Sequence, residues 1–357
     1  MNHSSLLEVI ASNFPLHSSQ PLQIKPLGEG LIHQTFLIAG QPKSWVLQGF
    51  NKNVFKFPER IAANLNLLSK LSESEHLPFI LPLPLENKKG GKLTEVKGQF
   101  YRLFEFVKGQ TIQKITHLNQ AYLAAKAYGQ FADWGKEIKA EDLQESIANF
   151  HRLDLRFSRF LEVLNSKKSL SPEEKEVADF YAGQSAFIDH YISSAKSLPF
   201  RLTHNDTKIN NLIFSENLNR VEAVIDLDTL MAGMLLYDFG DLVRTVACSE
   251  PETSQNWENL FLIPEVFEVL LKGYWEGIKD FANPDEIKSL LLGGEVMTII
   301  MGLRFFTDHL EGNVYYRVEY PEQNFHRAKN QMIFLQSQQS LQADLQEVWK
   351  KVTGSNL

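Results

Sequence analysis

The chain has 357 residues, a formal net charge of −7, and ordinary hydrophobic (43%) and charged (22%) fractions, which excludes disordered and fibrous proteins and leaves room for two lobes. The negative charge argues against a nucleic-acid binder that works through bulk positive charge, but it permits a small anionic ligand held by local donors. A single cysteine, Cys248, excludes an internal disulfide and a cysteine-based metal cluster and favours a reducing compartment.

No targeting or membrane segment is expected. The chain starts MNHSSLLEVIASNF, without a basic region followed by an apolar one, so no signal peptide is predicted. The most apolar stretch, residues 290–306, contains Glu295, Arg304 and three glycines, which favours a buried core helix over a membrane span. These features predict a cytoplasmic protein with no membrane partner.

The first hundred residues carry strand patterns. Five short β-prone runs are expected as strands: 21–30, 32–40, 44–50, 78–86 and 98–107. The second and third are expected to form a hairpin, and NKKGGK (87–92) to form the turn between the last two. Residues 58–71 carry apolar side chains at helical spacing from Ile61 to Leu71. The pattern predicts a small antiparallel sheet with one helix packed on it.

After Val107 the pattern becomes helical. Four segments with apolar residues at helical spacing are expected as helices: 119–138, 171–198, 264–278 and 284–306. The second begins with a capping box in which Ser171 is the N-cap and Glu174 its partner. Short β-prone runs return only between residues 200 and 228. The sequence therefore predicts an α+β protein with a sheet-rich amino-terminal lobe and a mainly helical carboxy-terminal lobe, joined near 104–109.

Within that β-prone region, residues 203–214 (THNDTKINNLIF) concentrate polar side chains before an apolar run. NLIF and VIDLD, joined by the polar turn SENLNR, predict a hairpin whose ends bring Asn211 and Asp226 together. Amide and carboxylate oxygens suit Mg²⁺, which takes one or two protein ligands and completes its shell with phosphates and water. Asp206 is then placed to accept a proton from a hydroxyl that attacks a γ-phosphate, and Lys208 to offset the charge of the transferred group.

The spacing H-x-D-x-K-x-x-N followed by an aspartate resembles the catalytic loop of protein kinases and of their small-molecule relatives. The alternative is that Asp206 and Asn211 cap a turn and Asp226 ends a strand. His204 is interpreted as a structural histidine that holds the loop by hydrogen bonds. Asp228 is either a second metal ligand or a hydrogen-bond acceptor within its turn.

Residues 238–240 spell DFG, the metal motif of protein kinases. They lie too far beyond Asn211 for that role, so Asp226 is assigned to the metal and Asp238 is expected to brace the catalytic loop. A protein kinase is not expected, because no recognisable A-P-E motif follows the metal aspartate.

Longer blocks carry a family resemblance. Residues 203–214, followed by VIDLDTLMAGMLLYDFGDLVR, resemble the aminoglycoside phosphotransferase and choline kinase family, which shares the kinase fold. The blocks GEGLIHQTFLI and GLRFFTDHLEGNVYY are most similar to its N-acetylhexosamine 1-kinase branch, which phosphorylates the anomeric hydroxyl of N-acetylglucosamine or N-acetylgalactosamine. The resemblance implies a bilobal, protein-kinase-like fold in which residues 1–106 bind the nucleotide and 107–357 carry catalysis and substrate binding. It also implies ATP and Mg²⁺ as cofactors and a small-molecule sugar as substrate.

Carried over residue by residue, the resemblance makes Asp206 the catalytic base and a substrate contact, Asn211 and Asp226 the Mg²⁺ ligands, and Lys208 a phosphate contact. Nucleotide contacts are implied at six further positions: Gly28, Gly30, Gln48, Phe104, Glu105 and Val107. The two glycines would cover the phosphates with backbone N–H groups, and 104–107 would offer backbone hydrogen bonds to adenine. The alternatives for these two segments are an ordinary turn and a plain linker.

Further sugar contacts are implied for His33, Arg304 and Tyr315. Arg304 lies in an apolar segment, and a buried arginine needs a partner, either a hydroxyl-rich or phosphate ligand or a salt bridge to Asp308 or Glu311. His33 is either a ligand contact or a structural histidine, and Tyr315 is either a ligand contact or a core aromatic.

One position departs from the kinase pattern. Kinases place a lysine on the third strand, paired with a glutamate on the next helix, to align the α- and β-phosphates. Here Gln48 stands at the lysine position and Asn66 near the glutamate position, while Lys52 and Lys56 are interpreted as surface charges. The departure motivates the alternative of a nucleotide-binding pseudokinase, which the intact Asp206 loop opposes. A phosphotransferase for an aminoglycoside, choline or another hexose is the remaining alternative.

Overall fold

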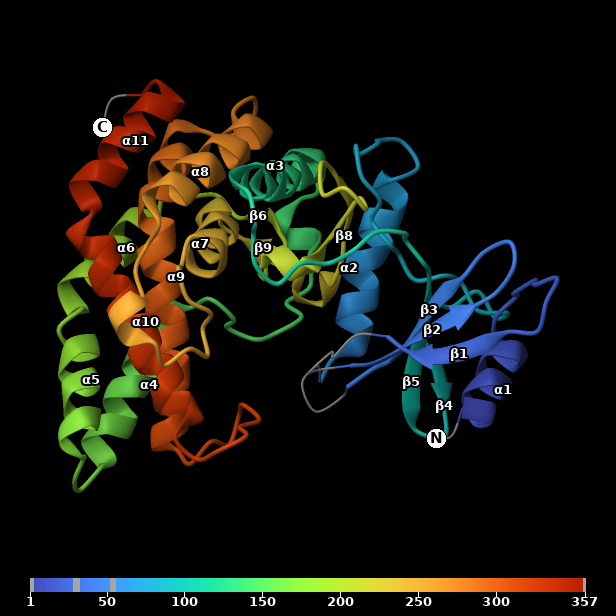
Figure 1. Ribbon diagram of the computed structural model, residues 1–357, viewed down its shortest axis with the longest axis horizontal. Coiled ribbons are helices and arrows are strands. Elements are labelled where there is room, and N and C mark those ends of the chain that lie inside the picture. The colour runs from blue at the N-terminus through green and yellow to red at the C-terminus, as the bar shows by residue number, and fades with distance from the viewer. Residues whose placement is uncertain (1–2, 28–32, 52–55, 356–357) are drawn as a thin grey trace.

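The computed structural model describes residues 3–27, 33–51 and 56–355 and shows two lobes side by side (Figure 1). The amino-terminal lobe, blue to teal in Figure 1, holds a β-sheet with two helices, and the other lobe is built mainly from helices. The predicted division into a sheet-rich and a helical lobe is confirmed. The last strand of the large sheet ends at Glu105, and the boundary between residues 106 and 107 stays a prediction.

The amino-terminal sheet is antiparallel, with the strand order β1-β2-β3-β5-β4. Its strands are β1 (Gln23–Pro26), β2 (Gln34–Ala39), β3 (Trp45–Gly49), β4 (Thr94–Val96) and β5 (Gln99–Glu105). Helix α1 (His3–Asn13) packs on the sheet, where Ile10 joins Leu103 in one apolar cluster. Helix α2 (Pro58–Leu71) instead contributes Leu65 to the core of the carboxy-terminal lobe. Thus α2 fixes the sheet against the lobe that carries the polar loop.

The predicted strand at 78–86 is wrong. Its three prolines have no backbone N–H to donate to a sheet ladder. The segment forms an isolated bridge between Ile80 and Ala223, and the Leu85 N–H donates to the Leu103 carbonyl of β5 at 2.7 Å. Ile80 donates to the Glu222 carbonyl at 2.8 Å and accepts from the Val224 N–H at 3.1 Å, so the segment links the two lobes. The fifth strand of the sheet is β4 instead, and its three residues are too few to show an alternating pattern in the sequence.

The carboxy-terminal lobe surrounds two short antiparallel ribbons with helices. The ribbons pair β6 (Arg201–Thr203) with β9 (Met231–Gly233) and β7 (Leu212–Phe214) with β8 (Val221–Val224). The helices are α3 (Leu118–Trp134), α4 (Leu153–Ser166), α5 (Pro172–Ala182), α6 (Ser185–Ala195), α7 (Leu235–Val246), α8 (Pro264–Ile278), α9 (Pro284–Leu310), α10 (Gln323–Ser340) and α11 (Gln342–Thr353). The predicted β7–β8 hairpin is confirmed.

The helix predictions are confirmed in part. Helices α3, α8 and α9 match the predicted segments, whereas 171–198 is two helices, α5 and α6, separated at Gly183. The capping box is present, because Ser171 Oγ accepts from the Glu174 N–H at 3.1 Å and Glu174 Oε2 accepts from the Ser171 N–H at 2.8 Å. Helices α1, α4, α7, α10 and α11 were not predicted.

Helices α7 and α9 cross so closely that only glycine fits between them. A Cβ on Gly240 would lie 2.1 Å from the carbonyl oxygen of Gly293, and a Cβ on Gly293 would lie 2.6 Å from that of Leu236. The glycine of the DFG sequence therefore serves helix packing. Within the described part of the chain, α9 alone is long and apolar enough to cross a membrane, yet 78% of its most apolar window is buried, which confirms the predicted core helix.

Glu295 on α9 makes the stability of this core depend on pH. Its side chain is 7% exposed, and burial raises its pKa to about 7. Because the folded pKa exceeds the unfolded one, its contribution to stability is complete below the ordinary glutamate pKa and is lost as pH rises through 7. We expect Glu295→Gln to change the free energy of unfolding little at pH ~5 and to raise it by about 2–3 kcal/mol at pH ~8.

Urea unfolding at both pH values measures this effect. Glu265→Gln is the matched control, because Glu265 is exposed in the first turn of α8. An equal effect of Glu295→Gln at both pH values would contradict the assignment of the raised pKa to Glu295.

Candidate active site

The β7–β8 hairpin brings Asn211 and Asp226 together. Leu212 pairs with Val224, and the next N–H along β8, that of Ile225, donates to the Asn211 carbonyl at 2.9 Å. Asp226 follows directly and has a left-handed backbone (φ 60°, ψ 55°), a conformation that non-glycine residues adopt mainly at turns and functional sites. The loop before β7 and the turn after β8 therefore meet at the same end of the hairpin.

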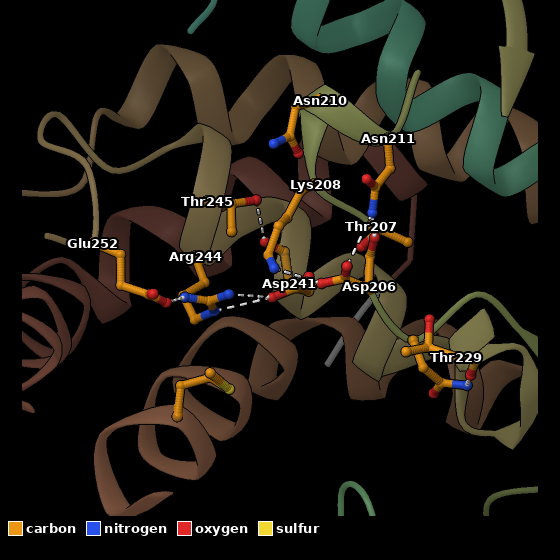
Figure 2. A network of polar contacts seen from close by, with 12 residues as sticks. Asp206, Thr207, Lys208, Asn210, Asn211, Thr229, Asp241, Arg244, Thr245 and Glu252 are labelled. Atoms are coloured by element: carbon orange, nitrogen blue, oxygen red, sulfur yellow. Dashed lines mark hydrogen bonds and ion pairs between the residues drawn. The ribbon is translucent and has the colours of Figure 1, made fainter. Parts of the chain in front are cut away.

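Asp206 lies on the loop before β7 and is held from two sides (Figure 2). Its Oδ1 lies 2.8 Å from Lys208 Nζ, and its Oδ2 accepts from Asn211 Nδ2 at 3.0 Å. Burial alone would raise the pKa of Asp206, but the Lys208 ammonium, together with His204 and the hydrogen bond from Asn211, lowers the pKa below its ordinary value. Asp206 is therefore an ionised carboxylate at neutral pH, with its two oxygens oriented by neighbours from the same loop.

Asp238 braces this loop, as predicted. It is fully buried on α7, and its two carboxylate oxygens accept the backbone N–H groups of His204 (2.9 Å) and Asn205 (2.7 Å). The Thr207 hydroxyl donates to the Asp238 carbonyl at 2.5 Å. Burial raises the pKa of Asp238 to about 6, while the two N–H donors oppose that rise. Helix α7 thus fixes the backbone on either side of Asp206.

His204 is a structural residue, again as predicted. Its Nε2 donates to the Ile225 carbonyl at 2.9 Å, and its ring packs edge-on against Tyr128 at 5.3 Å and Phe131 at 6.3 Å between ring centroids. The Tyr128 hydroxyl donates to the Lys208 carbonyl at 2.9 Å. These contacts hold the polar loop against α3 and the hairpin.

The residues at the end of the hairpin fit a Mg²⁺ ion bound together with phosphates. Asn211 commits its amide nitrogen to Asp206, so its amide oxygen remains an acceptor. The exposed Asp226 carboxylate has a pKa of about 7, raised by the surrounding protein and by the carboxylates of Asp228 and Asp206, and a divalent cation would relieve that repulsion. Within the described residues, no group of three or more His, Cys, Asp or Glu side chains forms a metal site, but nucleotide-bound Mg²⁺ needs only one or two protein ligands.

Asp228 forms hydrogen bonds to residues of the amino-terminal lobe. Neither of its predicted roles, as a second metal ligand or as an acceptor within its own turn, included such contacts. It is buried, and its Oδ2 accepts from His33 Nε2 at 2.7 Å and from Arg102 Nη2 at 2.5 Å. His33 Nδ1 accepts from the Asn51 N–H at 3.1 Å, so the ring proton lies on Nε2. Both ring nitrogens of His33 thus have protein partners, as its structural alternative requires. Its contact with a sugar stays a prediction.

Arg304 on α9 is surrounded by aromatic rings. Its guanidinium lies 5.0 Å from the ring centroid of Phe150, 5.4 Å from that of Tyr316 and 5.6 Å from that of Tyr315. Across residues 3–27, 33–51 and 56–355 it has no carboxylate partner. Tyr315 is 60% exposed, so its alternative as a core aromatic is wrong. Arg304 Nη1 donates to Met301 Sδ at 3.4 Å, and the aromatic frame leaves the other Arg304 donors for a polar ligand.

The salt-bridge alternative for Arg304 is also wrong. Asp308 instead accepts the backbone N–H groups of residues 315–316, at 2.7 and 3.0 Å, and so shapes the segment after α9. Glu311 pairs with Arg159.

The predicted nucleotide positions are described only in part. Gly28 and Gly30 lie outside the described residues. Gln48 on β3 accepts from Arg102 on β5. Phe104 and Glu105 end β5, and Val107 lies in the segment that runs on toward the carboxy-terminal lobe. Their adenine contacts stay predictions.

A charged cluster beside Lys208 was missed by the sequence analysis (Figure 2). Arg244 on α7 is buried and donates to Asp241 Oδ1 at 2.8 and 2.9 Å and to Glu252, which also accepts from Arg327 Nη2 at 2.5 Å. The pKa of Lys208 is raised, first by Asp206 and, after an opposing effect of burial, by the carboxylates of this cluster. The signal in the sequence was an arginine inside the apolar run LLYDFGDLVRTV.

Residues 23–261 match the sequence profile of the phosphotransferase enzyme family, and this match covers more than half of the chain. The chain belongs to this family. The matched region contains the loop of Asp206 and the hairpin that leads to Asp226.

Solved structures of small-molecule kinases share the fold of this phosphotransferase. Choline kinase from Cryptosporidium parvum Iowa II is 15% identical, with a TM-score of 0.59 over 97% of this chain and 98% of that one. A microcompartment-associated aminopropanol kinase is 14% identical, with a TM-score of 0.64 over 95% and 98%. Spectinomycin phosphotransferase in complex with ADP and spectinomycin is 12% identical, with a TM-score of 0.58 over 96% and 99%. The predicted kinase-like bilobal fold is confirmed, and the N-acetylhexosamine branch stays a prediction.

Proposed function

We propose that this phosphotransferase uses ATP and Mg²⁺ to phosphorylate the anomeric hydroxyl of an N-acetylhexosamine. The observation that supports the reaction is the geometry of the Asp206 loop, in which an ionised carboxylate, a lysine and the hairpin pair Asn211 and Asp226 meet. Spectinomycin phosphotransferase, which shares the fold, has been solved with ADP, and this supports an adenine nucleotide as donor. Bound Mg²⁺ would neutralise charge on the nucleotide phosphates.

Asp206 accepts the proton of the acceptor hydroxyl in this proposal. The hydroxyl oxygen forms a bond to the γ-phosphorus, the bond from that phosphorus to the β–γ bridging oxygen breaks, and ADP leaves with the electron pair. Lys208, 2.8 Å from Asp206, offsets the charge of the transferred phosphoryl group. Asn211 and Asp226 would hold the metal, and Asp238 keeps the loop in place through its two backbone hydrogen bonds.

The charge near Arg304 favours a neutral, hydroxyl-rich acceptor over a cationic one. Arg304 and Arg156 are close enough for Arg304 to lower the pKa of Arg156, after the larger effect of burial. Arg304 also lowers the pKa of His151, which burial brings to about 3. The two guanidiniums would repel choline or an aminoglycoside, and they can donate to sugar hydroxyl and acetamido oxygens.

ADP release with Mg-ATP across a panel of acceptors tests the proposal. The panel holds N-acetylglucosamine, N-acetylgalactosamine, glucose, galactose, choline and kanamycin. Turnover restricted to the N-acetylated sugars, with phosphate found on the anomeric oxygen, is the expected result. Turnover on choline or kanamycin alone would overturn the sugar assignment. ADP binding without turnover on any acceptor would favour the pseudokinase alternative.

Asp226→Ala is expected to remove the Mg²⁺ dependence of nucleotide binding. A carboxylate that holds the metal strengthens binding only when the metal is present, so the gain in ADP affinity on adding Mg²⁺ should fall by about 10-fold or more. Calorimetric titration of ADP with Mg²⁺ and with EDTA measures this gain. Asp280→Ala, at an exposed aspartate after α8, is the control. An unchanged metal dependence in Asp226→Ala would refute its role as a ligand.

A further inference from the structure

The lysine and glutamate that align nucleotide phosphates in kinases are both replaced in this chain. Gln48 stands on β3, and Asn64 is the polar residue that α2 buries, whereas the expected Asn66 is exposed. Asn64 Nδ2 donates to two backbone carbonyls, those of Gln144 and Leu230, both at 2.8 Å. Its role is to join α2 to the other lobe, and neither replacement carries a charge for a phosphate.

Arg102 brings a positive charge to the same place from the neighbouring strand. It lies directly opposite Gln48 in the antiparallel pair of β3 and β5, so both side chains project from one face of the sheet. Its Nε and Nη2 donate to Gln48 Oε1 at 2.9 and 2.6 Å, and Nη2 also donates to Asp228 Oδ2 at 2.5 Å. The residue is 4% exposed, and its guanidinium lies 5.1 Å from the ring of Phe50 and 5.4 Å from that of Phe104.

One end of this guanidinium remains available. Within residues 3–27, 33–51 and 56–355, Arg102 Nη1 has no hydrogen-bond partner, although Nε and Nη2 are fixed by Gln48 and Asp228. A buried arginine with a fixed orientation and two remaining N–H groups is a phosphate donor with little entropy left to lose on binding.

We propose that Arg102 binds the α- and β-phosphates of the nucleotide in place of the strand lysine of kinases. Asp228 is its counter-ion, in place of the helix glutamate, and Gln48 is a positioning residue that holds the guanidinium. The proposal rests on the proposed use of a nucleotide by this site. It explains why a chain without the strand lysine retains the complete Asp206 loop.

The surroundings of Arg102 agree with this role. Asp228, which accepts from Arg102 at 2.5 Å, lies two residues beyond Asp226, the proposed metal ligand. The cation therefore lies near the metal end of the site, where the phosphates of a Mg²⁺-bound nucleotide must be. His33 donates to the same Asp228 oxygen and keeps that carboxylate facing Arg102.

Comparing the affinities of the full-length protein for ADP and for adenosine separates a phosphate contact of Arg102 from a purely structural role. Arg102→Met should lower the affinity for ADP by about 10- to 100-fold, which is the scale expected when a charged hydrogen bond is lost. The affinity for adenosine should stay within about 2-fold of the wild-type value. Arg102→Lys should fall between the two, because it keeps the charge but loses the fork that Gln48 holds. Arg220→Met, at an exposed ion pair on the β7–β8 turn, is the matched control.

A relocation variant sharpens the test. Gln48→Lys combined with Arg102→Leu puts a cation at the usual kinase position and should recover at least part of the ADP affinity that Arg102→Met loses. Equal losses for ADP and adenosine, or unchanged ADP affinity in Arg102→Met, would overturn the phosphate role. If Arg102→Met does not fold, the ratio of ADP to adenosine affinity in Arg102→Lys decides, since a wild-type ratio there contradicts the proposal.

The outcome is independent of the proposed acceptor. Wild-type protein that fails to bind ADP would refute the nucleotide-dependent function itself. Wild-type protein that binds ADP with Mg²⁺, beside an Arg102→Met variant with unchanged selectivity for ADP over adenosine, would refute the role of Arg102 alone.

Discussion

Asp206→Asn is expected to lower kcat by ~10²–10⁴-fold, the usual loss for a positioned base, while the Kd for ADP changes little. The carboxylate can accept a proton from the acceptor hydroxyl, and the amide cannot. Asparagine has nearly the same shape, so the hydrogen bond from Asn211 to this side chain can persist through the amide oxygen. ADP release at saturating Mg-ATP and acceptor gives kcat, and calorimetry gives the Kd.

Asp133→Asn is the matched control for this substitution. Asp133 forms an ion pair with Lys136 at 2.9 Å on the surface of α3, so it undergoes the same chemical change in an exposed setting. A near-wild-type kcat for Asp206→Asn would remove Asp206 from the role of base. A parallel loss of ADP binding would instead indicate that the loop has been displaced.

The parts of the site that the sequence could predict are those encoded at short spacing. Asp206, Lys208 and Asn211 lie within six residues of one another on the chain, and the hairpin that returns to Asp226 is local as well. The structure brings these residues together because β7 and β8 pair in the register that their apolar residues dictate. Asp238 could be assigned to bracing because its distance from Asn211 excluded the metal role.

The parts that the sequence could not predict depend on contacts between distant elements. The pair of Arg102 and Asp228 joins residues 126 positions apart, and the link from Arg327 to Glu252 joins residues 75 apart. No periodicity encodes such pairs. Gln48 was recognised as a departure, but the cation that lies beside it comes from a strand whose pairing only the fold reveals.

The predicted strand at 78–86 and the salt-bridge alternative for Arg304 failed for identifiable physical reasons. Residues 78–86 have the apolar character of a strand, but their prolines cannot donate to a ladder, and the segment links the lobes instead. Arg304 was weighed against partners one helical turn or two away, yet those carboxylates bind backbone groups and another arginine. The spacing of side chains along a helix says which residues can meet, and competing partners from other elements decide which do.

Asp238→Ala is expected to reduce both stability and turnover, because the residue supports the loop without touching substrate. Removing its carboxylate leaves the buried N–H groups of His204 and Asn205 without acceptors, which should lower the free energy of unfolding by about 2–4 kcal/mol. Asn205 has a left-handed backbone (φ 63°) that these hydrogen bonds help to hold, so Asp206 should shift when they are lost. A displacement of about 1 Å can lower kcat by ~10²-fold.

Urea unfolding and ADP release measure the two effects, and Asp280→Ala serves as the exposed control. Asp238→Asn keeps one acceptor oxygen and should therefore fold more stably than the alanine variant while remaining impaired in kcat. The KM for ATP should change less than kcat, because Arg102 and the metal ligands lie outside the loop segment that Asp238 holds. A stability loss with unchanged kcat would show that the loop keeps its geometry without the brace, and the catalytic orientation of Asp206 would then have to come from Lys208 and Asn211 alone.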